Sequence, residues 1–269
     1  MNNFVKRTLS GILFVSLIVS SILLSSYTFA LVFALICVLA VREFHTLTNS
    51  KIVNVNVIVA MIGAGLLFAS SYINASGLMP AIGYALYGLF VVIVLISELY
   101  RKQDNPLNNW AYFIMGQVFI ALPFSLLPLI VFVNHYQPLI LLAVFVTIWV
   151  NDTGAYVVGV TMGKHRLFER ISPKKSWEGF FGGAFFALLS GYAFSMFIPE
   201  ISLVQWLIFS ELVVVFGTYG DLVESLLKRT VHVKDSSNLI PGHGGILDRF
   251  DSMVLVAPVI YIYLNFLFK

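Results

Sequence analysis

The sequence has little charge and a single cysteine, and these two shortages exclude several classes of protein. Only 11% of its 269 residues are charged and 59% are hydrophobic, which is far above the apolar share of soluble domains. The one cysteine, Cys37, excludes an intrachain disulfide and a cluster of thiolate metal ligands. We therefore expect an integral membrane protein without a soluble domain, and no nucleic acid among its partners.

What the sequence has in place of charge is a series of long apolar runs. Each is near the roughly 20 residues that a membrane-spanning helix needs, so the sequence predicts an all-α, polytopic helical membrane protein of about nine transmembrane helices. Their expected cores are residues 10–26, 28–41, 53–71, 80–98, 110–133, 138–162, 179–198, 203–220 and 252–267. The first run also resembles a signal peptide, but its length favours a retained span.

Basic residues fall on alternate loops. Of the 16 Lys and Arg residues, all but Lys269 lie before the first run or after the second, fourth, sixth and eighth runs. The loops "SYINASG", "NHYQ" and "IPEIS" contain none. Because basic loops mark the cytoplasmic side, the pattern predicts a cytoplasmic amino terminus.

The chain divides into two regions by the placement of its polar loops. Residues 1–140 have short loops without clustered chemistry and are predicted to be an N-terminal transmembrane scaffold. Residues 141–269 hold the longer loops, 163–178 and 221–251, and are predicted to be the C-terminal catalytic region. Within this region "GFFGG" spaces Gly179 and Gly183 four residues apart, which predicts close packing of two helices.

Acids in or beside apolar helices are the most informative residues, because they are costly in a bilayer and are usually functional. Asp152 interrupts the run "FVTIWVNDTGAYVVGV". Asp221 and Glu224 end the eighth run with a spacing of three residues, and Asp248 and Asp251 repeat this spacing at the start of the last run. Paired carboxylates of this kind predict a divalent cation, and Mg²⁺ is usually held by one or two carboxylates together with substrate phosphates.

The loop between these acid pairs predicts a phosphate site. The stretch "PGHGG" has Gly242, Gly244 and Gly245, where backbone N–H groups can approach an anion closely. The basic residues around it are Lys228, Arg229, Lys234, His243 and Arg249. The earlier stretch "ISPKKSWEG" adds Lys174, Lys175, Ser176 and Glu178 as a second group able to hold phosphate.

With these residues in view, the chain resembles the phosphatidate cytidylyltransferases, also called CDP-diacylglycerol synthases. The stretch "SLLKRTVHVKDSSNLIPGHGGILDRFD", from Ser225 to Asp251, fits every fixed position of that family's signature. The stretches "SPKKSWEG" and "ND" before "TGAY" are further family features. The resemblance implies transfer of CMP from CTP to phosphatidate, which gives CDP-diacylglycerol and pyrophosphate for phospholipid biosynthesis.

The resemblance also implies roles for particular residues and partners. Expected catalytic residues are Asp152, Lys174, Lys175, Lys228, Arg229, His243 and Arg249; substrate-binding residues are Ser176, Glu178, Ser225, Lys234, Asp235, Gly244 and Gly245; metal ligands are Asp221, Asp248 and Asp251. Mg²⁺ is the expected cofactor, at one or two sites. A homodimer in a bacterial inner membrane is expected, with the active site facing the cytoplasm and with CTP, phosphatidate and membrane lipid as partners.

Two other functions use similar residues. A CTP-dependent lipid kinase needs the same metal and phosphate contacts and also a general base, for which His243 or Asp152 is available. An ion-coupled transporter also carries acids in broken membrane helices. Its acids are expected at the membrane centre, whereas most of the acids here lie at helix ends.

Overall fold

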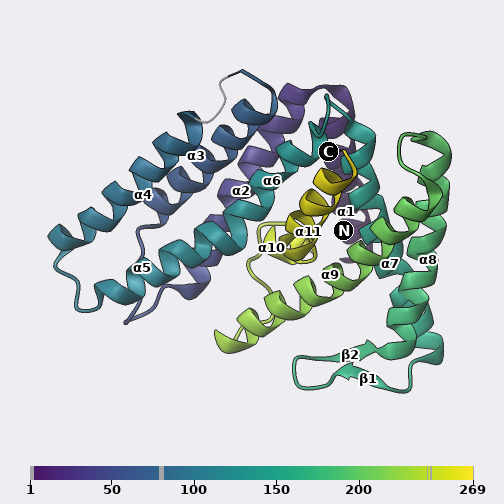
Figure 1. The fold of residues 1–269 in the computed structure, drawn as a ribbon. Coiled ribbons are helices and arrows are strands. Elements are labelled where there is room, and N and C mark those ends of the chain that lie inside the picture. The colour runs from purple at the N-terminus through teal and green to yellow at the C-terminus, as the bar shows by residue number, and fades with distance from the viewer. Residues whose placement is uncertain (1–2, 79–81, 241, 243, 269) are drawn as a thin grey trace. The chain divides into compact units, whose positions relative to one another are not determined.

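A computed structural model describes residues 3–78, 82–240, 242 and 244–268, and in them nearly all of the regular structure is helical (Figure 1). The elements are α1 (Asn3–Leu24), α2 (Ser26–Thr48), α3 (Val57–Ala75), α4 (Ile82–Arg101), α5 (Pro106–Met115), the π-helix η1 (Gly116–Ala121), α6 (Leu122–Val131), α7 (Pro138–Met162), β1 (Arg166–Phe168), β2 (Ser172–Ser176), α8 (Trp177–Phe197), α9 (Leu203–Thr230), α10 (Leu247–Phe250) and α11 (Met253–Leu267).

The helices begin where the sequence supplies caps. Ser25 and Thr28 form a capping box at the start of α2, and Ser202 and Gln205 form another at the start of α9. Pro138 occupies the first turn of α7, where the missing N–H of proline costs nothing. Between such starts the apolar runs form helices because a backbone in lipid must satisfy its own hydrogen bonds.

The predicted all-α membrane fold is confirmed. Within the described residues, eight helices are long and apolar enough to cross a membrane, counting 106–131 and 247–267 as one each. The first run of the sequence corresponds to a shorter apolar helix, Thr8–Leu24. The total of nine spans and the cytoplasmic side of the amino terminus therefore stay predictions.

The chain folds into two compact units, and each is described here by itself. Unit 1 comprises 1–136 together with 235–250, and unit 2 comprises 137–234 together with 251–269. The signature stretch from Ser225 to Asp251 is therefore divided, because its glycine loop belongs to unit 1 and its two ends belong to unit 2. The proposed boundary at residue 140 lies close to the first crossing between the units and stays a prediction.

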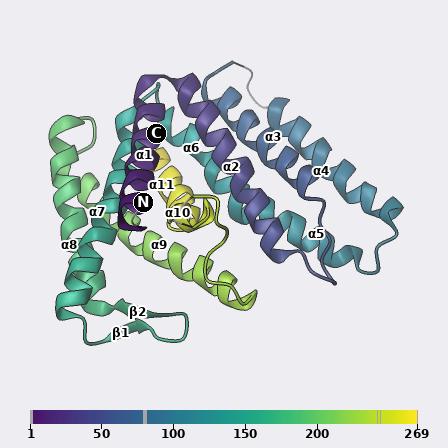
Figure 2. The ribbon, with the colours of Figure 1, turned by 180° about the vertical axis from the view of Figure 1, so that it is seen from behind.

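In unit 1, α2 packs against α1, α3 and η1, and α3 packs against α4 and α6. Figures 1 and 2 show α4 beside α3 in both views. The core is aromatic, and Phe250 at the end of α10 makes edge-to-face contacts with Phe33 and Phe124. These contacts bury about 150–250 Å² for each ring. They anchor the 235–250 segment in the unit formed by the first half of the chain.

In unit 2, α8 packs on α7 and α9, and α11 packs on α9. The expected close approach at the "GFFGG" stretch is confirmed. A Cβ at Gly179 would lie 2.8 Å from the Ala155 carbonyl oxygen, and one at Gly183 would collide with the Asn151 side chain. The two glycines therefore let α8 lie directly against α7.

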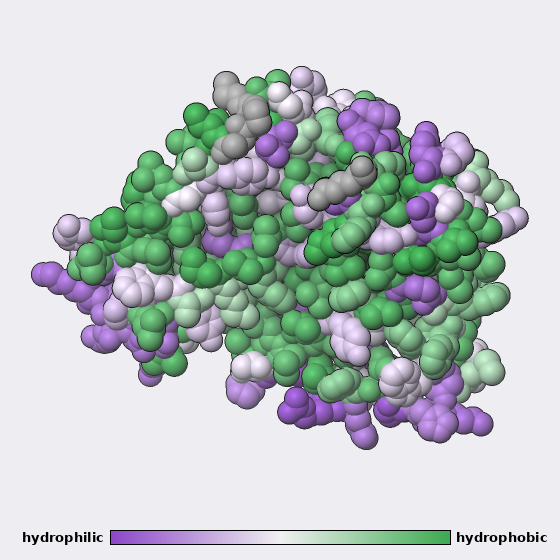
Figure 3. Space-filling view, viewed as in Figure 1, coloured by the Kyte–Doolittle hydropathy of each residue, from purple (hydrophilic) through white to green (hydrophobic). Residues whose placement is uncertain are grey.

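A polar β-hairpin joins α7 to α8. Strands β1 and β2 are antiparallel, with Arg166 opposite Ser176 and Phe168 opposite Ser172. In Figure 3, hydrophobic residues cover most of the visible helices, and hydrophilic residues gather at this hairpin. The hairpin corresponds to the first of the two long polar loops that the sequence analysis singled out.

Candidate active site

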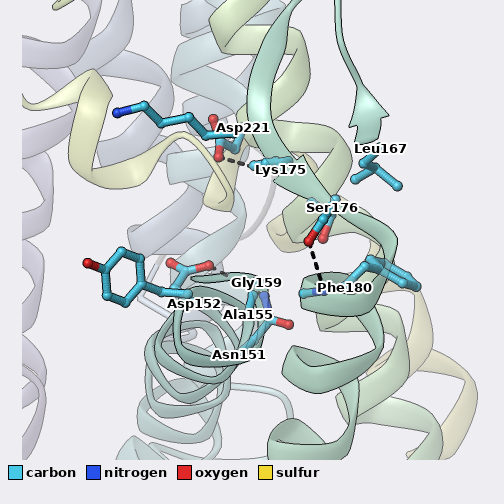
Figure 4. Close-up of a pocket in the computed structure, with 13 residues that line it drawn as sticks. Asn151, Asp152, Ala155, Gly159, Leu167, Lys175, Ser176, Phe180 and Asp221 are labelled. Atoms are coloured by element: carbon cyan, nitrogen blue, oxygen red, sulfur yellow. Dashed lines mark hydrogen bonds and ion pairs between the residues drawn. The ribbon is translucent and has the colours of Figure 1, made fainter. Parts of the chain in front are cut away.

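A polar cavity of unit 2 lies between α7, the hairpin, the start of α8 and α9. Its volume is about 270 Å³, and Figure 4 shows the residues that line it. They are Asn151, Asp152, Ala155, Tyr156, Gly159, Leu167, Lys174, Lys175, Ser176, Gly179, Phe180, Thr218 and Asp221. Five of the predicted site residues, Asp152, Lys174, Lys175, Ser176 and Asp221, are thus brought together by two helices, α7 and α9, and strand β2.

Asp221 is the acid of this cavity that has a cationic partner. Lys175 Nζ lies 2.6 Å from Asp221 Oδ2, and the two side chains are 27% and 31% exposed. Ser225, one turn later on α9, donates a hydrogen bond to Asp221 Oδ1 at 3.1 Å. An ion pair with this much exposure contributes about 0–1 kcal/mol to stability. Lys175 can therefore exchange Asp221 for a substrate phosphate at little cost.

Asp152 enters the cavity from α7. It is exposed, and the buried Asn151 beside it donates a hydrogen bond to Asp152 Oδ1 at 3.4 Å. Figure 4 shows the Lys175–Asp221 pair on one side of the cavity and Asp152 on another. The cavity therefore presents two acids and two lysines, a combination suited to phosphate and a cation.

Ser176 and Glu178 hold the hairpin and the start of α8. The buried Ser176 accepts a hydrogen bond from the Gly179 N–H at 3.1 Å, which caps α8. Glu178 accepts from the backbone N–H groups of Lys164 and His165 and pairs with His165 Nδ1 at 2.6 Å. Ser176 lines the cavity and Glu178 does not. The contacts of Glu178 instead connect the start of α8 to the backbone at the start of the hairpin.

Further acids of unit 2 gather at the carboxyl-terminal end of α9. A Cβ at Gly220 would lie 2.7 Å from the Asp251 carbonyl oxygen, so Asp251 runs directly beside α9. Its carboxylate interacts electrostatically with Asp221, Glu224 and Asp152. Lys228 Nζ lies 2.6 Å from Glu224 Oε2. This concentration of negative charge favours binding of a cation.

The other predicted residues of unit 2 lie in the last turn of α9 and in the segment that follows it. Arg229 is exposed and donates to the Val233 carbonyl oxygen at 3.5 Å, and Lys234 is also exposed. In unit 1, Asp235 and Arg249 are exposed at the two ends of the glycine loop. His243 lies outside the described residues.

The glycine loop of unit 1 fixes Asp248 through its backbone. Asp248 Oδ2 accepts hydrogen bonds from the N–H groups of Ser236 and Gly245, both at 2.8 Å, and from Ser236 Oγ at 3.0 Å. Gly244 has φ +86°, a conformation that favours glycine. The chain thus folds back on itself, and Ile240 pairs with Gly244. One oxygen of Asp248 is held by donors from both sides of the loop.

Glu43 is the residue of this site that the sequence analysis missed. It lies on α2, is 4% exposed, and its carboxylate accepts four hydrogen bonds from the loop segment. The signal was present, since Glu43 is an acid just after the predicted apolar core 28–41. The rule that selected Asp152 applies to it equally.

The structure also bears on how a metal would be held. Within the described ranges, no group of three or more His, Cys, Asp or Glu side chains is arranged to hold a metal ion. A Mg²⁺ site with one or two protein carboxylates, completed by substrate oxygens, requires no such group. The metal-ligand roles of Asp221, Asp248 and Asp251 therefore stay predictions.

Comparison with known proteins gives consistent matches along the chain. A sequence model of the cytidylyltransferase family matches residues 5–267. The phosphatidate cytidylyltransferase of Bacillus subtilis (strain 168) is 39% identical over 181 residues, which cover 65% of this chain and 66% of the relative. Those of Staphylococcus saprophyticus (32% over 264 residues) and Staphylococcus aureus strain COL (33% over 267 residues) are each matched over 96% of this chain and 98% of the relative.

The fold defines a polytopic membrane protein, and unit 2 has a cavity lined by two acids and two lysines. The chain belongs to the cytidylyltransferase family, and it is therefore a nucleotidyltransferase. The resemblance to phosphatidate cytidylyltransferases that Ser225–Asp251 predicted is confirmed.

Proposed function

We propose that this membrane enzyme transfers CMP from CTP to phosphatidate, forming CDP-diacylglycerol and pyrophosphate for phospholipid biosynthesis. The observation that carries the proposal is the similarity over 96% of the chain to relatives named phosphatidate cytidylyltransferase. The cavity of unit 2 supports it, because two lysines and two acids there suit a reaction between phosphates. Neither a lipid kinase nor a transporter is favoured by these relatives.

The reaction joins two polyanions. An oxygen of the phosphatidate phosphate attacks the α-phosphorus of CTP, a new P–O bond forms, and the bond to the bridging oxygen breaks as pyrophosphate leaves. The attacking phosphate is already ionised near neutral pH, so the enzyme needs no strong general base. Its main tasks are to offset charge repulsion and to hold the reactants in line. Lys174 and Lys175, at the cavity wall, are placed to contact the phosphates.

Mg²⁺ fits the donors that the chain offers. Asp221 and Asp251 in unit 2 and Asp248 in unit 1 are the proposed ligands, and all are hard oxygen donors. The crowding of Asp251 by three other acids supports a cation in unit 2. When bound, Mg²⁺ would neutralise charge on the phosphates and on the departing pyrophosphate. Lys175, released from Asp221, would then contribute its own charge to the phosphates.

We also infer a homodimer in a bacterial inner membrane, with the site facing the cytoplasm. The alternation of basic loops supports the orientation. In a variant without Cys37, single cysteines at Ser76 and Asn238 should react with a membrane-impermeant thiol reagent from opposite sides. Labelling of both from the external side would contradict the orientation.

Crosslinking of the purified protein in lipid should give dimers at low protein-to-lipid ratio.

Labelled CTP tests the reaction itself. Purified protein given phosphatidate and CTP labelled at the α-phosphorus should place label in the lipid fraction, whereas γ-label should appear only in pyrophosphate. A lipid kinase would give the reverse pattern, and a transporter would transfer neither label. Diacylglycerol should be inactive because it lacks the phosphate nucleophile. Transfer of γ-label to diacylglycerol would overturn the proposed function.

A further inference from the structure

A buried glutamate in the first half of the chain holds the loop that carries Asp248. Glu43 lies within the span Ser26–Thr48 and is 4% exposed. An acid in such a helix costs roughly 2.5–3.5 kcal/mol on insertion scales, so it needs partners that compensate for this cost. In unit 1 those partners all come from the segment 235–250.

Four donors converge on the Glu43 carboxylate. Ser237 Oγ and the Ile246 N–H donate to Oε1, at 2.6 and 2.9 Å. Ser236 Oγ and the Leu247 N–H donate to Oε2, at 2.9 and 3.0 Å. Two of these donors precede the glycines of the loop and two follow them. One side chain therefore closes the loop at its base.

The contacts of Glu43 extend to Asp248 through Ser236. The hydroxyl of Ser236 lies 2.9 Å from Glu43 Oε2 and 3.0 Å from Asp248 Oδ2. The N–H of the same residue donates to Asp248 Oδ2 at 2.8 Å. Because the hydroxyl has one proton to share between the two carboxylates, displacing Ser236 would remove an N–H donor of Asp248 and the polar contact that links the two acids.

The same arrangement explains why position 245 is glycine. A Cβ there would overlap Ser236 Oγ and would lie 2.5 Å from Glu43 Oε2. The space that a side chain would need is filled by the Glu43 carboxylate and its partner. Gly245 is then free to donate its N–H to Asp248.

We propose that Glu43 is a positioning residue, which fixes the 235–250 loop and through Ser236 sets the orientation of Asp248. The proposal rests on the proposed function for the role of Asp248 in the reaction. Glu43 itself is buried, and its effect on the reaction would pass through the loop. Its loss should therefore lower kcat and leave KM for CTP and phosphatidate within about twofold, because misplacement of a reacting group acts on the chemical step.

Glu43→Gln is the decisive substitution. The amide keeps the size of the side chain but presents an NH₂ group to one of the two backbone N–H donors, so that hydrogen bond is lost, and the serine hydroxyl on the same side must turn to accept. We expect kcat to fall about 10²-fold, the size of effect that a displacement near 1 Å produces. Glu43→Asp keeps the charge and should recover part of this loss.

Glu98→Gln is the matched control. Glu98 is also a buried acid of unit 1, at 7% exposure. Its partners are Arg101 and Asn109, which belong to α4 and α5 and not to the loop. This substitution should leave kcat within about threefold.

A spectroscopic measurement tests the position of the loop without any turnover. Nitroxide labels on cysteines at Thr46 and Asn238, both exposed, in a chain lacking Cys37, report the separation of α2 from the loop. Glu43→Gln should broaden the distribution of distances between the two labels, as measured by their dipolar coupling. Glu98→Gln should leave this distribution unchanged. If Glu43→Gln impairs insertion, Ser237→Ala removes a single donor and should give a smaller broadening with about a threefold lower kcat.

The outcomes separate this proposal from the proposed function. An unchanged dipolar coupling in Glu43→Gln, or an equal loss of kcat in Glu98→Gln, would overturn the positioning role. A parent protein that forms no CDP-diacylglycerol would overturn the proposed function, and the spin-label result would still decide whether Glu43 holds the loop.

Discussion

Two of the predicted metal ligands, Asp221 in unit 2 and Asp248 in unit 1, are held by different means. Asp221 pairs with the flexible side chain of Lys175 and accepts from Ser225. Asp248 accepts two backbone N–H groups and one hydroxyl on a single oxygen. A second acid, Glu43, accepts hydrogen bonds from the backbone of the same loop.

This difference separates a replaceable contact from a fixed one. A partly exposed ion pair contributes little to the free energy of folding. Lys175 can therefore move to a phosphate when substrate enters. Backbone donors have no such freedom, because moving them requires the loop to move. We therefore expect unit 2 to adapt to the nucleotide and the loop of unit 1 to present a preformed acid.

Removing the charge of each acid is the strongest test of this comparison. Asp248→Asn and Asp221→Asn should each lower kcat by roughly 10²–10³-fold, as the loss of a charge-stabilising group does in other enzymes. The effect should be greater at Asp248, because its new NH₂ group also faces fixed backbone donors. Turnover at saturating Mg²⁺ measures both losses.

Asp104→Asn is the control for these two variants. Asp104 is exposed and lies between α4 and α5, and none of the proposed site residues belongs to these two helices. Its activity should match the parent. Retention of most activity by Asp248→Asn would mean that the loop acid is not part of the reaction.

A methyl group at Gly245 should have the next largest effect. Gly245→Ala would force Ser236 and Glu43 apart, and such overpacking costs about 1–3 kcal/mol. We expect a lower midpoint of thermal unfolding and at least a tenfold lower kcat. Gly88→Ala on α4, where a Cβ meets no atom within 4 Å, should leave both unchanged. Equal behaviour of the two variants would contradict the fixed loop.

The smallest expected effects come from the serines that donate to the two acids. Ser236→Ala removes the hydroxyl that contacts both Glu43 and Asp248 and should destabilise the protein by about 1–3 kcal/mol. Ser225→Ala removes one partly exposed hydrogen bond to Asp221 and should cost about 0.5–1 kcal/mol. Thermal unfolding in detergent compares them. A larger loss at Ser225 would reverse the distinction between the two acids.

Much of the fold could be predicted from the sequence because it follows from single segments. The apolar runs give spanning helices whatever their neighbours, and "GFFGG" gives a close helix contact through Gly179 and Gly183. The hairpin at 166–176 was expected only as a polar loop. Its strands depend on Glu178 binding the backbone of Lys164 and His165, a contact that periodicity does not reveal.

The candidate site was predictable where its residues are neighbours in sequence. Asp221 and Ser225, or Gly245 and Asp248, lie within one turn, so spacing alone places them together. Glu43 could be recognised as an unusual acid, but its partners Ser236 and Ile246 follow 193 and 203 residues later. Only tertiary structure joins them.

That separation sets an order of events during synthesis of the chain. At a rate of synthesis of roughly 5–20 residues per second, Glu43 is made about 10–40 s before Ile246. Throughout this interval the acid has none of its final donors, and a bare carboxylate in an apolar setting is costly. The helix must therefore enter the bilayer with Glu43 in contact with water or with other polar groups. The packing of unit 1 is completed only when Phe250 has been made, near the end of the chain.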